Sequence, residues 1–75
     1  MGEGMTTDYA AEAKRWLAWT RRQDFATTAE HVWAVRVGLY LRQLAERETK
    51  ENAIGLQEAM ANFEDARAAS RAKVG

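Results

Sequence analysis

The pattern of apolar and polar positions is helical along most of the chain. From Tyr9 onward, apolar residues return every three or four positions, and alanine recurs throughout. The β-branched residues Val32, Val35 and Val37 cluster together, but the residues between them do not alternate between apolar and polar as strand residues would. The pattern therefore predicts an all-α protein, a small bundle that is either a helical hairpin or three helices.

The first predicted helix covers about residues 7–20. Thr7 is placed to cap its first turn, where the negative charge of Asp8 is favourable. Residues 23–26 make the connection to the next helix. The inward stripe of this helix is expected to consist of Tyr9, Ala13, Trp16, Leu17 and Thr20.

The second predicted helix begins at a capping box, in which Thr27 covers the third amide and Glu30 reaches back. A helical projection gives this helix two apolar faces, and one neighbouring helix cannot cover both. The broad face consists of Trp33, Val37, Tyr40, Leu41 and Leu44, with Ala34, Gly38 and Ala45 along its margin. The second face is a ridge of Val32, Val35 and Leu39.

A third helical pattern follows, and it is separated from the second by a turn near residues 48–52. Thr49 or Asn52 is suited to cap the new helix, whereas charged residues at four-residue spacing would favour an unbroken rod instead. We predict the turn. The inward stripe of the third helix is expected to consist of Ala53, Leu56, Met60, Phe63 and Arg67.

The length of 75 residues allows one small domain. The polar, glycine-containing residues 1–6 are interpreted as a flexible leader or a remnant of cloning. Residues 7–71 are expected to form a single helical domain, and residues 72–75 a frayed C-terminus.

Charge and composition narrow the range of partners. Eleven Lys and Arg balance eleven Asp and Glu, so the overall field does not attract nucleic acid or an anionic membrane. No apolar stretch is long enough to cross a bilayer, because Arg36 interrupts the longest one. There is no cysteine, which is compatible with the cytoplasm, the compartment we expect.

Catalytic and metal-binding residue patterns are absent from the sequence. His31 is the only histidine, and it has no acidic residue three or four positions away. Glu30 is explained by the capping box, and no phosphate-binding loop or nucleophile motif occurs. We therefore expect a protein that is not an enzyme, with no catalytic residues, cofactor or metal.

The apolar surface of the second helix predicts self-association. Two short flanking helices do not hide all of it, and the small residues Ala34 and Gly38 would let another backbone approach closely. We expect a homodimer in which the second helices of two chains meet around a two-fold axis. The predicted interface consists of Trp19, Trp33, Ala34, Val37, Gly38, Tyr40 and Leu41, with Arg36 and Arg42 as rim charges.

The function that follows is a non-catalytic protein-interaction module, an accessory, regulatory or inhibitory subunit. Its partners would be a second copy and an unidentified protein. The alternative is a DNA-binding regulator, because Ala34, Gly38, Leu39 and Leu44 fit a helix-turn-helix pattern. Arg47, where that pattern expects an apolar residue, and the zero net charge disfavour nucleic acid.

Overall fold

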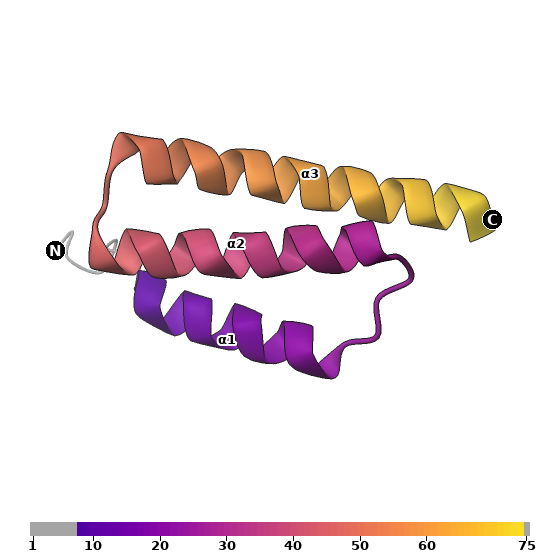
Figure 1. The fold of residues 1–75 in the computed structure, drawn as a ribbon, viewed down its shortest axis with the longest axis horizontal. Helices are drawn as coiled ribbons and strands as arrows, with labels where there is room; N and C mark the ends of the chain where they lie inside the picture. The colour runs from indigo at the N-terminus through magenta and orange to yellow at the C-terminus, as the bar shows by residue number, and fades with distance from the viewer. Residues whose placement is uncertain (1–7, 75) are drawn as a thin grey trace, which may run out of the picture.

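The protein is an all-α bundle of three helices, seen in a computed structural model that describes residues 8–74 (Figure 1). The helices are α1 (Tyr9–Arg22), α2 (Thr28–Glu46) and α3 (Lys50–Val74). Helix α2 lies between the other two, and each helix runs antiparallel to the one before it (Figure 1). The described residues contain no strand, so the predicted all-α class is confirmed in its three-helix form. The predicted leader, residues 1–6, lies outside the described part of the chain.

Helix α1 begins one residue later than predicted. The amide of Ala11 donates a hydrogen bond to the Asp8 carboxylate at 3.1 Å, so Asp8 is the capping residue. Thr7, the predicted cap, lies outside the described residues. The helix continues to Arg22, two residues beyond the predicted end.

Helix α2 begins at the predicted cap. The amide of Glu30 donates to the Thr27 hydroxyl at 3.1 Å. The Glu30 carboxylate accepts from the amide of Ala26 at 3.2 Å, one residue before the cap. Its other oxygen lies 3.8 Å from Nε of Arg67 on α3, so this buried side chain connects the loop, α2 and α3.

The predicted turn between α2 and α3 is also present, at residues 47–49. Thr49 is the cap: its hydroxyl accepts from the amide of Asn52 at 3.1 Å. The Asn52 side chain donates to the carbonyl of Arg47 at 3.0 Å, which holds the turn from its other end. The unbroken rod is therefore not formed.

Helix α1 packs closely on α2 because Gly38 has no side chain. A Cβ atom at Gly38 would lie 2.5 Å from Cδ2 of Leu17 and 3.2 Å from Cδ1 of Trp16. The Trp16 indole N–H donates to the backbone carbonyl of Ala34, one helical turn before Gly38. The small-residue groove that we predicted for a second molecule is thus filled by the chain's own α1.

Helix α3 packs on the other side of α2, and glycine again provides the space. A Cβ atom at Gly55 would lie 2.7 Å from Cζ of Tyr40, so the Tyr40 ring occupies the place of a side chain. The helix runs on to Val74, past the predicted frayed end. Its buried residues are Ala59, Phe63 and Ser70, with Asn52, Gly55, Leu56, Asn62 and Ala66 half-buried.

The predicted stripe of α3 is therefore correct at Leu56 and Phe63 and wrong at Ala53, Met60 and Arg67, which are exposed. Small residues face α2, and they let the helices approach more closely than a stripe of large side chains would.

Aromatic side chains join α1 to α3. Among the described residues the backbones of these two helices do not meet. The rings of Trp16 and Trp19 lie 5.8 and 6.1 Å from that of Phe63, and Trp19 lies 5.3 Å from Phe25. These rings cover one side of α2. The core beneath them consists of Ala13, Ala34, Val37, Leu41, Ala59 and Phe63.

Candidate protein-interaction face

The side of α2 that faces away from the core carries exposed apolar residues. Val32 is 41% exposed and Leu39 is 40% exposed, and Val35 between them is half-buried. At 100° per residue these three lie opposite the buried Val37. We call Val32, Val35 and Leu39 the outer ridge; the sequence predicted it as the second apolar face of this helix.

Grooves border the outer ridge on both sides. One lies between α1 and α2, and its apolar wall includes Leu17 of α1 together with Val35 and Leu39. The other is formed by α2 alone, beside Tyr40. Val35 and Leu39 line both grooves, so the ridge separates one groove from the other.

Arginine residues border this surface. Arg21 of α1 and Arg42 of α2 line the groove on one side, and Arg36 lines the groove on the other. The Arg36 guanidinium lies 5.3 Å from the centre of the Trp33 ring. Within residues 8–72 the ion pairs are Arg15–Glu12 and Arg67–Glu30, so the three bordering guanidinium groups have no carboxylate partner there.

The residues predicted for the dimer interface lie in or against the core of the folded chain. Ala34 is 0% exposed, Val37 1% and Leu41 7%, and Gly38 is buried as well. The remaining three, Trp19, Trp33 and Tyr40, are partly buried against the core. Trp19 lies on α1, and the other six lie on α2 in or against the core, whereas the predicted rim residues Arg36 and Arg42 are exposed.

A second molecule would therefore meet the outer ridge first. Sequence reasoning recognised this ridge but did not name its members as contact residues. It missed Leu17 and Arg21 as well, because only the packing of α1 on α2 brings them to this surface. The apolar character of Val32, Val35 and Leu39 was the signal available in the sequence.

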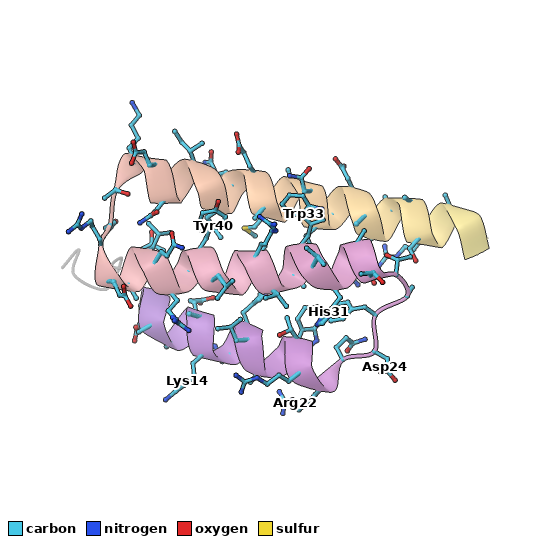
Figure 2. All side chains as sticks on the ribbon, in the orientation of Figure 1. Lys14, Arg22, Asp24, His31, Trp33 and Tyr40 are labelled. Atoms are coloured by element: carbon cyan, nitrogen blue, oxygen red, sulfur yellow. The ribbon has the colours of Figure 1, made fainter. Side chains whose placement is uncertain are left out.

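His31 is not part of a cluster of metal ligands within the described part of the chain. His31 is exposed, and its ring stacks on Phe25 at 5.2 Å between centres. Figure 2 shows His31 near the end of α2 that follows the α1–α2 loop, whereas Tyr40 lies toward the other end of the helix. Within residues 8–74, no group of three or more His, Asp or Glu side chains is placed to hold a metal ion.

The helix-turn-helix pattern needs a turn at Gly38, but α2 continues through Gly38 without a break. No helix in the described part of the chain is both long enough and apolar enough to cross a membrane. Comparison with known proteins found no matching family model, no matching curated protein and no matching solved structure.

Proposed function

We propose that this protein is a non-catalytic protein-interaction module that binds through the outer ridge of α2. It would act as an accessory, regulatory or inhibitory subunit, self-associate, and work in the cytoplasm. One observation carries the proposal: Val32 and Leu39 remain 41% and 40% exposed on a helix that buries Val37, Leu41 and Leu44. Contiguous exposed apolar surface on a soluble domain is typical of an interface.

The bordering charges support a protein partner. Arginine is enriched in protein interfaces, where it surrounds an apolar centre and pairs with acidic groups of the partner. Arg21, Arg36 and Arg42 are arranged in this way around the ridge. Asp24 lines the same groove as Arg21 and Arg42, but no ion pair within residues 8–72 involves any of the three arginines.

The test compares two exposed apolar residues. Leu39→Ser removes an apolar side chain from the outer ridge, and Met60→Ser removes one of similar exposure, 43%, from α3. Immobilised parent protein and both variants are incubated with proteins of the native host, and each is examined by sedimentation velocity. We expect a specific protein partner or self-association that Leu39→Ser loses and Met60→Ser keeps.

The proposal fails if Leu39→Ser changes neither protein binding nor self-association while its circular dichroism spectrum remains helical. The DNA alternative is tested beside it with a random duplex at low salt. Retardation of the duplex that weakens on Arg42→Ala and on raising the salt concentration would favour DNA binding.

A further inference from the structure

We call the side of the molecule that carries the outer ridge its outer side. Basic residues of α1 lie along one edge of this side. Lys14 and Arg21 of α1 line the grooves that also contain Arg42 of α2. Both side chains are exposed, and they follow each other at helical spacing along the same side of α1. Asp24 and Glu46 line the same grooves, so the α1 half of this side carries three Lys or Arg residues against two acidic ones.

The opposite edge of the same side carries more acidic than basic groups, although Arg36 of α2 lines its groove and Lys50 begins α3. Between residues 51 and 66, α3 contains four acidic residues and no Lys or Arg. Phe63 marks the side of α3 that faces the tryptophans, and at 100° per residue Ile54, Glu58 and Asp65 lie about 140–180° away from it. They lie farther around α3 from Phe63 than Gly55 does. Gly55 contacts Tyr40, which lines the groove formed by α2 alone.

We propose that the occupant of the outer ridge is a second copy of this chain, related by a two-fold axis that runs parallel to α2. This inference rests on the proposed function and names the partner of the same face. Rotation about such an axis exchanges the two edges. The basic edge of each copy, Lys14 and Arg21, then lies over the acidic edge, Glu58 and Asp65, of the other, and the two ridges pack together.

The charges distinguish this arrangement from the other face-to-face dimer. A two-fold axis in the same plane but perpendicular to α2 would place α1 over α1 and α3 over α3. Basic residues would then face basic residues, and acidic residues would face acidic ones, which is unfavourable. Opposite charge at the two edges of one face therefore selects parallel α2 helices.

The available area is sufficient. A stable interface of standard size buries about 800 Å² on each partner. The surface of the chain is 5710 Å², so such an interface needs about one-seventh of it, which one side of a three-helix bundle supplies. The apolar centre would consist of Leu17, Val32, Val35, Leu39 and Ile54.

Disulfide cross-linking tests the direction of the helices. The chain has no cysteine, so Val32→Cys and Leu39→Cys each introduce a single thiol. These positions lie about 10 Å apart along α2, farther than the Cα separation that a disulfide spans. In the parallel dimer each position meets its own counterpart, so each variant forms a covalent dimer on mild oxidation.

An antiparallel dimer would give a different result. With the axis midway between the two positions, only a mixture of Val32→Cys and Leu39→Cys chains would cross-link; with the axis elsewhere, at most one of the two variants would cross-link with itself. That outcome would overturn the proposed geometry.

Charge reversal tests the pairing of the edges. One variant carries Lys14→Glu and Arg21→Glu, and another carries Glu58→Lys and Asp65→Lys. Each alone places like charges opposite each other, so we expect the dimer dissociation constant to rise roughly tenfold or more. An equimolar mixture restores opposite charges at both edges, and we expect heterodimers with parental affinity in sedimentation equilibrium.

Circular dichroism of each variant separates loss of folding from loss of association. The inference is overturned if the parent chain stays monomeric at high concentration, or if the mixture associates no better than the separate variants. A monomeric parent that still binds a host protein through Leu39 would overturn this inference and the proposed self-association, and would leave the proposed role as a subunit of a larger partner.

Discussion

At the residue scale, two glycines within helices determine how the bundle packs. Glycine costs about 1 kcal/mol relative to alanine inside a helix. Gly38 and Gly55 are nevertheless placed where Leu17 and Tyr40 occupy the space of their missing side chains. The sequence predicted close approach at Gly38, but it could not show that the approaching helix belongs to the same chain.

The Trp16 hydrogen bond gives a prediction at this scale. Trp16→Phe removes the donor to the Ala34 carbonyl, whereas Trp19→Phe makes the same reduction in size without losing a hydrogen bond in the described structure. We expect Trp16→Phe to lower the free energy of unfolding by about 1 kcal/mol more than Trp19→Phe does. Urea denaturation followed by circular dichroism measures the difference, and equal losses would show that the indole bond contributes nothing.

The orientation of Met60 shows why residue positions in α3 were harder to predict. The sequence pattern placed the largest apolar residues inward, and Met60 fits that rule. The structure instead buries Ala59 and leaves Met60 43% exposed. Which side of an alanine-rich helix faces the core depends on the shape of the neighbouring helix, and this information is not local to the segment.

At the scale of the elements, helix starts are set by local hydrogen bonds and were therefore accessible from sequence. Thr27 and Thr49 accept amide hydrogen bonds from residues three positions ahead, as their residue types indicate. The face that each helix buries is a tertiary property. For this reason the broad face of α2 was recognised correctly, but its contact partner was not.

The cap of α3 gives a prediction at this scale. Thr49→Ala removes the hydroxyl that accepts the Asn52 amide, whereas Thr28→Ala changes an exposed threonine in the first turn of α2 that is not the cap. We expect Thr49→Ala to lower the free energy of unfolding by about 1 kcal/mol and Thr28→Ala to change it little. Thermal denaturation compares the two variants, and equal midpoints would contradict a stabilising role for this cap.

At the scale of the whole molecule, a net charge of zero conceals a separation of charge. Lys14 and Arg21 line a groove between α1 and α2, and helical spacing places Glu58 and Asp65 on the side of α3 away from Phe63. From the composition alone, we expected no electrostatic attraction to nucleic acid or to an anionic membrane. Only the fold brings these groups onto one side, and this arrangement could not be predicted from their number.

The proposed dimer gives a prediction for the complete chain. Because association stabilises the folded state, we expect the melting midpoint to rise by several degrees between about 5 and about 500 µM protein. Raising the ionic strength from about 0.05 to about 0.5 M should reduce this gain, because salt screens the charged edges. Differential scanning calorimetry measures both effects. The Leu39→Ser variant should melt at a midpoint independent of concentration, and a parent chain that did the same would argue against association.

The bridge from α1 to α3 consists of aromatic rings, and two of them are tryptophans. Trp16 and Trp19 therefore act as an intrinsic optical probe of whether the first helix is docked. Detachment of α1 would move both indoles from a partly buried cluster into water and shift their emission to longer wavelength, so the opening of this helix is observable without any attached label.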